Sequence, residues 1–161
     1  GWKAGGHAAL YAQAVSSLEP PPDQVDQMLR RVKRYDPKGH DQWPDANLAL
    51  QRLMSSYMGD IRSEQGLKIG LYRLQELIGE WKMAARHPHE TMRVLEIANL
   101  ATIAKACLTD ALERKASSHY HLHFRVDYPE WDPPEWKKWV LVRQQEDKIS
   151  IEHRPIEYKS H

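Results

Sequence analysis

The longest helical pattern in the sequence runs from Pro88 to about Lys115 and constrains the fold more than any other segment. Between Ile97 and Leu108 the polar residues cover roughly a third of the helix circumference, at about 100° per residue. These polar residues are Asn99, Thr102 and Lys105. A helix that is apolar on most of its sides must be surrounded by other elements. The pattern therefore predicts a mainly α fold with this helix at its centre.

Two shorter amphipathic helices precede the long one. The first is predicted between Pro44, a residue type favoured in the first helical turn, and Gly59, a residue type common at helix ends. The second has Ser63 as its N-cap and ends before His87-Pro88. Its apolar residues recur on one face of a straight helix. They are Leu67, Leu71, Leu74, Ile78 and Trp81. We expect a bundle of about three to five helices.

Composition shifts divide the chain into four predicted segments. A helical pattern rich in alanine extends from Trp2 to Leu18, and Glu19-Pro20-Pro21-Pro22 ends it because consecutive prolines remove backbone donors. The predicted segments are a terminal helix at 1–18, a linker with a short amphipathic helix at 19–43, the helical bundle at 44–117 and an extended aromatic tail at 118–161. Within the tail, Trp139–Arg143 and Lys148–Glu152 are predicted as the strands of a possible short β-hairpin.

Charge and cysteine content exclude several classes of protein. Lys and Arg number 23 against 22 Asp and Glu, so no net field favours nucleic acid or an anionic membrane as a partner. The basic run at 30–34 is interpreted as a solvated helix face. The single cysteine, Cys107, cannot form an internal disulfide, which favours a cytoplasmic location, and we expect it to be a small buried side chain. No apolar run approaches the ~20 residues of a transmembrane helix.

Three histidines in the tail suggest a possible metal site. On an extended strand His119, His121 and His123 would project to the same face, and imidazoles are common ligands of transition metals. However, alternate strand residues lie roughly 6.5–7 Å apart, so three of them rarely converge on one ion. The alternative is that these histidines pack and form hydrogen bonds in a loop among aromatic side chains.

Three tryptophans in the tail are candidates for contact with another protein. Trp131, Trp136 and Trp139 lie among prolines that hold the backbone extended. Such side chains bury a large area at little entropic cost, which suits them to anchor a partner. The alternative is that these rings cover the ends of the helices.

Several motifs, taken in chain order, resemble those of one known superfamily. The opening GWKAGGHAALYA and the run 95–115 are similar to the last helix of the flavin-binding domain and to the long helix of the C-terminal helical domain in flavoprotein subunits of the fumarate reductase and succinate dehydrogenase superfamily. Asp127-Tyr128-Pro129-Glu130 occupies the place of its aspartate-tyrosine-proline signature. The tail, with Arg125 two residues before Asp127, is most similar to the alpha subunit of adenylylsulfate reductase. Ala116-Ser117-Ser118 replaces the usual glutamate-serine-arginine run.

The resemblance implies the C-terminal part of an FAD-dependent oxidoreductase subunit. A chain that opens inside a helical pattern without an initiator Met agrees with such a piece. Flavin contacts and catalytic residues of these subunits precede the position of Gly1, so none is assigned here, and no FAD is expected on this chain alone. The expected partners are the flavin-binding domain of the same subunit and possibly an iron–sulfur subunit. The residues expected to meet a partner are Trp131, Trp136, Trp139, Arg125 and Tyr128. The alternative function is an autonomous helical module that binds a protein through the tail.

Overall fold

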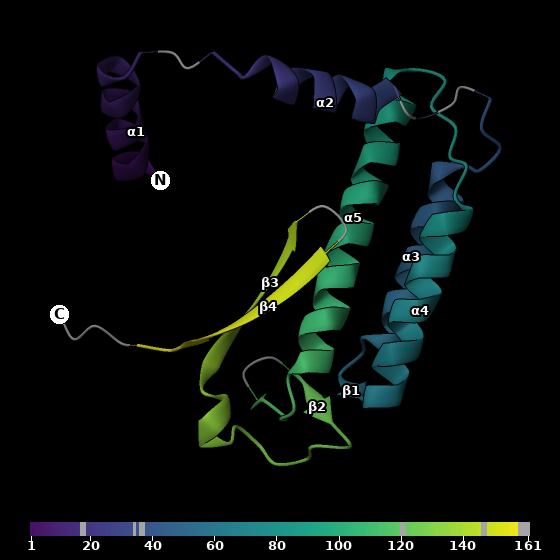
Figure 1. Ribbon diagram of the computed structural model, residues 1–161, viewed down its shortest axis with the longest axis vertical. Helices are drawn as coiled ribbons and strands as arrows, with labels where there is room; N and C mark the ends of the chain where they lie inside the picture. The colour runs from purple at the N-terminus through teal and green to yellow at the C-terminus, as the bar shows by residue number, and fades with distance from the viewer. Residues whose placement is uncertain (17–18, 34, 36–37, 120–121, 146–147, 158–161) are drawn as a thin grey trace. The chain divides into compact units, whose positions relative to one another are not determined.

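The computed structural model describes residues 1–16, 19–33, 35, 38–119, 122–145 and 148–157. The chain divides into two compact units, Gly1–Arg34 and Tyr35–His161, which are treated separately below. The helices lie mainly in the sequence up to residue 113, and the strands of the longer pair follow in the tail (Figure 1). The predicted mainly α fold is thereby confirmed.

The first unit consists of two helices that bury none of their side chains. Helix α1 spans Trp2–Ala14 and α2 spans Pro22–Lys33. Trp2 is 91% exposed and Tyr11 is 70% exposed. Helix α1 ends before the predicted Leu18, which lies outside the described residues, because Val15 already has extended dihedral angles. The basic residues of the 30–34 run that the structure describes lie in the last turn of α2, where positive charge suits the helix dipole.

The second unit is built around three helices. Helix α3 spans Trp43–Tyr57, α4 spans Glu64–Glu80 and α5 spans Pro88–Glu113, and the three pack side by side (Figure 1). The main core cluster consists of Leu50, Leu53, Leu67, Leu74, Ala101, Ala104, Leu108 and Ala111. A second cluster consists of Ala46, Met83, Val94 and Ile97. No described helix is both long enough and apolar enough to span a membrane.

Side-chain caps fix where two of these helices begin. The hydroxyl of Ser63 accepts a hydrogen bond of 3.1 Å from the Gly66 N–H, which confirms Ser63 as the N-cap of α4. The ring of His87 accepts a longer bond, 3.4 Å, from the Glu90 N–H at the start of α5. The breaks inferred from the sequence at Gly59 and at His87 thus separate the three helices of the bundle.

Helix α5 keeps part of its surface exposed among the described residues of the second unit. Its buried residues recur at helical spacing and face α3 and α4. They are Val94, Ile97, Ala101, Ala104, Leu108 and Ala111. Elsewhere on the helix Met92, Leu100 and Ile103 are 45%, 45% and 57% exposed. Cys107, expected to be buried, is only half-buried. The long apolar helix therefore lacks part of the cover that its sequence predicts.

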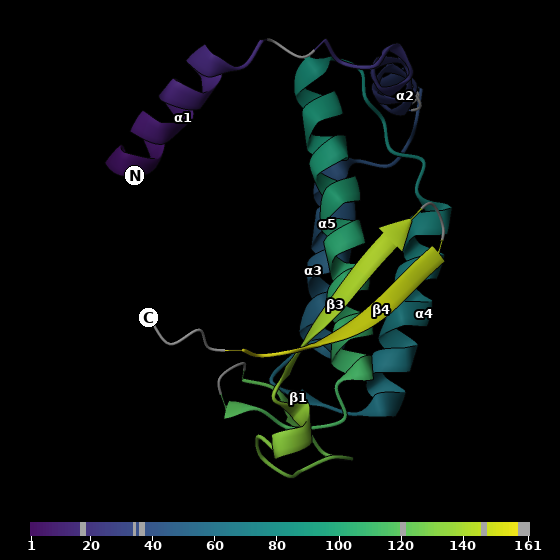
Figure 2. The same ribbon diagram turned by 60° about the vertical axis from the view of Figure 1, so that its left-hand side comes forward.

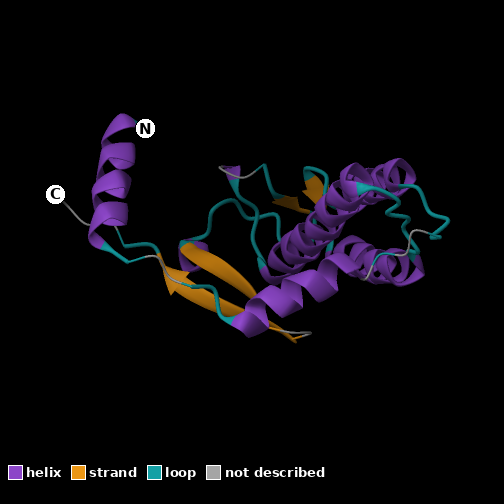
Figure 3. Cartoon of the chain, turned by 90° about the horizontal axis from the view of Figure 1, so that it is seen from above, coloured by secondary structure: helices purple, strands orange, loops and turns teal. Residues whose placement is uncertain are grey.

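Two separate strand pairs complete the second unit (Figure 3). Strands β1 (Ile61–Arg62) and β2 (Phe124–Arg125) pair in parallel and bring the tail next to the α3–α4 connection. Strands β3 (Lys138–Gln145) and β4 (Lys148–Pro155) pair antiparallel, with Gln145 opposite Lys148. This confirms the predicted hairpin, with longer strands than expected. The hairpin lies along α5, against which β3 packs (Figure 2).

Candidate functional site

Arg125 connects the tail to the end of the long helix. Its side chain is completely buried. Nη1 donates to the carbonyl oxygens of Ala111 at 2.7 Å and Arg114 at 3.0 Å, in the last turn of α5 and at its C-cap. Carbonyl groups at a helix end have no partner within the helix and carry the negative end of the dipole. The guanidinium of Arg125 supplies hydrogen-bond donors for these carbonyl groups and a positive charge for the negative end of the dipole. Arg125 therefore acts as a side-chain cap of α5.

Asp127 joins this cap to a second helix. It receives two hydrogen bonds from Arg125, from Nε at 2.8 Å and from Nη2 at 2.7 Å. Its Oδ2 also accepts a 2.8 Å bond from the Glu64 N–H, in the first turn of α4. Chiefly because of the bonds from Arg125, the pKa of Asp127 is lowered to about 2. One ion pair therefore links the C-terminal end of α5 to the N-terminal end of α4.

His123 lies beside this ion pair as a buried neutral ring. It is 3% exposed, and its Nδ1 faces the guanidinium of Arg62. Burial, followed by the charges of Arg62, Arg125 and Arg114, lowers the pKa of His123 to about 4. Its Nε2 has no hydrogen-bond partner in the described part of the chain. The ring is therefore uncharged near neutral pH, and protonating it would add a positive charge beside three arginines.

The two described histidines of the possible metal site, His119 and His123, lie in different environments. His119 stacks on Trp131 with ring centroids 3.9 Å apart, and its Nδ1 lies 2.9 Å from Asp132 Oδ2. Between His119 and His123 the chain turns back at Leu122, which has a φ of 45°. The described residues contain no group of three His, Cys, Asp or Glu side chains that could hold a metal ion. His121 lies outside the described residues, so a metal site that involves it stays a prediction.

The five residues expected to meet a partner occupy different environments. Trp131 and Trp139 are 44% and 54% exposed, so these two rings are available at the surface. Trp136 is half-buried, with the Arg114 guanidinium 5.5 Å and the Lys138 ammonium 4.2 Å from its centroid. The remaining two face inward: Arg125 caps α5, and the half-buried ring of Tyr128 lies 5.0 Å from the Arg125 guanidinium.

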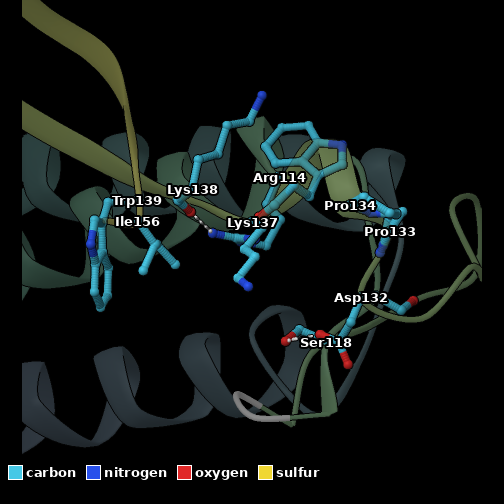
Figure 4. A pocket seen from close by; sticks show the side chains of 11 residues that line it. Arg114, Ser118, Asp132, Pro133, Pro134, Lys137, Lys138, Trp139 and Ile156 are labelled. Carbon is cyan, nitrogen blue, oxygen red and sulfur yellow. Dashed lines mark hydrogen bonds between the residues drawn. The ribbon is translucent and has the colours of Figure 1, made fainter. Parts of the chain in front are cut away.

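A cavity of about 750 Å³ lies next to these tryptophans, at the junction of α5, the tail and the hairpin. Trp139 and Ile156 stand at one end of it, and Ser118 and Asp132 stand at the other (Figure 4). Among the described residues that line it, Arg114, Lys137 and Lys138 are basic and Asp132 is acidic. Hydrogen bonds from Ser118 and His119 hold the pKa of Asp132 below its usual value. The described lining thus combines apolar walls with basic side chains.

Two features of the site were not predicted from the sequence. Arg62 belongs to a strand of two residues, which is too short to leave a periodic pattern. Ser117 is fully buried and orders the tail: its Oγ accepts from the Arg125 N–H at 2.9 Å and donates to the Tyr128 carbonyl at 2.9 Å. The only available signal was its position between the long helix and the aspartate-tyrosine-proline motif.

The chain belongs to the family described as the fumarate reductase flavoprotein C-terminal domain, which its residues 47–161 match. It is 28% identical over 145 residues to the succinate dehydrogenase flavoprotein subunit of Coxiella burnetii. This alignment covers 86% of this chain and 24% of that protein. It is also 28% identical over 114 residues to L-aspartate oxidase of Streptomyces coelicolor, in an alignment that covers 68% of this chain and 19% of that protein. The superfamily inferred from the sequence motifs is therefore confirmed.

Solved structures show the same fold. Adenylylsulfate reductase of Archaeoglobus fulgidus superposes with a TM-score of 0.78 at 22% identity, over 92% of this chain and 27% of that one. The Mycobacterium smegmatis Sdh1 complex with UQ1 superposes with a TM-score of 0.79 at 22% identity, over 94% of this chain and 27% of that one. The chain spans only about a quarter of the length of such proteins.

Proposed function

We propose that this chain serves an FAD-dependent oxidoreductase subunit by packing against its flavin-binding domain, while its tail meets an electron-transfer partner. The observation that carries the proposal is the set of apolar side chains that the chain leaves exposed. They lie on α1, where Trp2 and Tyr11 are examples, and on α5, where Leu100 and Ile103 are examples. Apolar surface that a folded chain leaves exposed marks sites where another domain can pack.

The assignment of residues 1–18 to the flavin-binding domain is part of this proposal. Helix α1 is apolar enough to pack, yet none of its residues is buried in this chain. Gly5 and Gly6 have open space where a Cβ would stand, so another backbone could approach closely there. The expected FAD would then bind to the parent subunit through residues that this chain does not contain.

An absorbance spectrum tests where the flavin is held. The purified chain is expected to show no visible absorbance band of oxidised flavin, because none of its residues is assigned to FAD. The parent subunit, purified in the same way, is expected to be yellow. Stoichiometric flavin on this chain alone would contradict the proposal.

A substitution on α5 tests whether a flavin domain covers its exposed face. Ile103→Asp is expected to change the free energy of unfolding of the chain alone by about 0.5 kcal/mol or less, because this side chain is largely exposed. In the parent subunit the same carboxylate would be desolvated, which lowers the unfolding temperature and the flavin content. Ile69→Asp on α4, where Ile69 is 40% exposed, is the matched control. Equal effects of Ile103→Asp in both proteins would contradict the packing role.

The second candidate function is an autonomous module that binds a protein through the tail. The exposure of Trp131 and Trp139 is the observation that favours it. Such a module needs no cover on α5, so it predicts that Ile103→Asp is harmless in the full-length protein as well. The same experiment therefore separates the two functions.

A further inference from the structure

Helix α2 carries an apolar stripe that the first unit leaves open. Val25, Met28, Leu29 and Val32 recur at i, i+3, i+4 and i+7, which is one face of a helix. The four side chains are between 39% and 58% exposed, and no residue of α2 is buried. Apart from Pro22, the other residues of the helix are polar or charged. Helices in proteins gain most of their stability by packing such a face, so the stripe marks a contact surface.

The charges of α2 are divided along its length. Asp23 and Asp26 lie in the N-terminal half, whereas Arg30, Arg31 and Lys33 lie in the last turn. This order suits the dipole of the helix itself and gives its two halves opposite charge. A second α2 that ran antiparallel to the first would therefore place its basic half beside the acidic half of the first.

The charges next to the stripe fit the same arrangement. Asp26 and Lys33 are separated by roughly two helical turns, so both border the same side of the stripe. In an antiparallel pair with a two-fold axis, the same sides of the two helices meet, and Asp26 of each copy faces Lys33 of the other. A parallel pair would instead bring Lys33 beside Arg31 of the second helix, which lies on the opposite side of the stripe. Like charges would then repel.

We propose that α2 pairs antiparallel with α2 of a second copy of this chain, apolar stripe against apolar stripe. The stripe is symmetric about its midpoint, so Val25 of one copy faces Val32 of the other, and Asp26 and Lys33 form two symmetry-related ion pairs. Charge complementarity is the argument for this occupant. An anionic lipid surface fits less well, because it would press the Asp26 carboxylate against negative head groups.

The proposed contact is isologous, so it ends at two copies. One short helix from each copy buries less than the standard interface of about 1,600 Å², which makes the dimer weak and its population dependent on concentration. Sedimentation equilibrium of the full chain, from micromolar to millimolar concentration at low salt, measures this association. The natural chain is expected to form a dimer and no larger species.

A carboxylate in the stripe tests where the two copies meet. Val25→Asp is expected to weaken the dimer about tenfold or more, because the contact would desolvate the new charge. Gln27→Asp, on the polar side of α2, changes the net charge equally and is expected to leave the association unchanged. Circular dichroism of both variants verifies that they are folded. A dimer that survives Val25→Asp, or a natural chain that stays monomeric at millimolar concentration, would overturn the proposal.

A charge swap tests the antiparallel order. Asp26→Lys alone is expected to weaken the dimer about tenfold, because it places a lysine against Lys33 of the second copy. Adding Lys33→Asp restores the ion pairs with their signs exchanged, so the double variant is expected to regain the natural affinity. A double variant as weak as Asp26→Lys contradicts the pairing. Binding of the monomeric chain to phosphatidylserine vesicles, abolished by Val25→Asp, would assign the stripe to lipid instead. None of these outcomes bears on the cover of α5, which Ile103→Asp tests separately.

Discussion

Replacement of Arg125 by methionine is expected to lower the free energy of unfolding by about 3–4 kcal/mol, since truncating one member of a buried pair leaves its partners unsatisfied. The residues left without their donor are Ala111 and Arg114, through their carbonyl oxygens, and Asp127, through its carboxylate. Methionine fills a similar volume, so the decrease in the free energy of unfolding would come from the lost hydrogen bonds and not from a new cavity. Urea unfolding followed by circular dichroism measures the difference.

An exposed arginine on the hairpin provides the matched control. Arg143 lies 3.2 Å from Glu152, and its side chain is 58% exposed. Arg143→Met is therefore expected to cost about 1 kcal/mol or less, as is usual for surface ion pairs. If Arg125→Met costs no more than Arg143→Met, Arg125 does not hold the tail on α5. Arg125→Lys should recover only part of the loss, because an ammonium cannot reproduce the paired bonds to Asp127.

The bundle and the hairpin could be predicted because they rest on local periodicity. The apolar spacing between Leu67 and Trp81 and the cap at Ser63 require no knowledge of the rest of the chain. The place of Arg125 could not be predicted in this way. Arginine is rarely fully buried, and its partners here are backbone carbonyls of α5, whose position depends on where that helix ends. The sequence around Arg125 therefore carries no local signal that distinguishes a helix cap from a partner contact.

The places of His119 and His123 also could not be predicted from the local sequence pattern. Their spacing places them on one face only if the backbone is extended, and Leu122 instead adopts a left-handed conformation that reverses the chain. Ser118 and His123 then pair through two backbone hydrogen bonds of 2.8 Å and 3.2 Å. His119 is consequently directed toward Trp131, while His123 enters the interior beside Arg62. The alternate spacing of the histidines in the sequence carries no signal for this turn.

The comparisons establish the family but leave the substrate open. A succinate dehydrogenase subunit and an L-aspartate oxidase match this chain at 28% identity each. The shared part is the C-terminal domain, in which Arg125 and Asp127 tie the ends of α4 and α5 to the tail.

The second large effect is a loss of stability in mild acid that comes from His123. Its pKa is about 4 in the folded chain, against 6.5 for an ordinary histidine. Between these two values the unfolded chain binds a proton that the folded chain does not, so the free energy of unfolding falls as the pH is lowered from 6.5 toward 4. The expected loss is about 3 kcal/mol in total, at about 1.4 kcal/mol per pH unit. Urea unfolding at a series of pH values measures this slope.

His123→Gln is the decisive variant, because glutamine keeps a polar side chain of similar reach but cannot take up the proton. Its stability is expected to be nearly independent of this group between pH 6.5 and 4, whereas His7→Gln on the exposed helix α1 should retain the slope of the natural chain. Asp127 acts in a separate window, since its pKa of about 2 lies below the ordinary 3.8, and the stability that it contributes is lost only as the pH falls from 3.8 toward 2. An unchanged slope in His123→Gln would mean that the ring is not held neutral among the arginines. A direct NMR titration of the His123 ring with a midpoint near 6.5 would lead to the same conclusion.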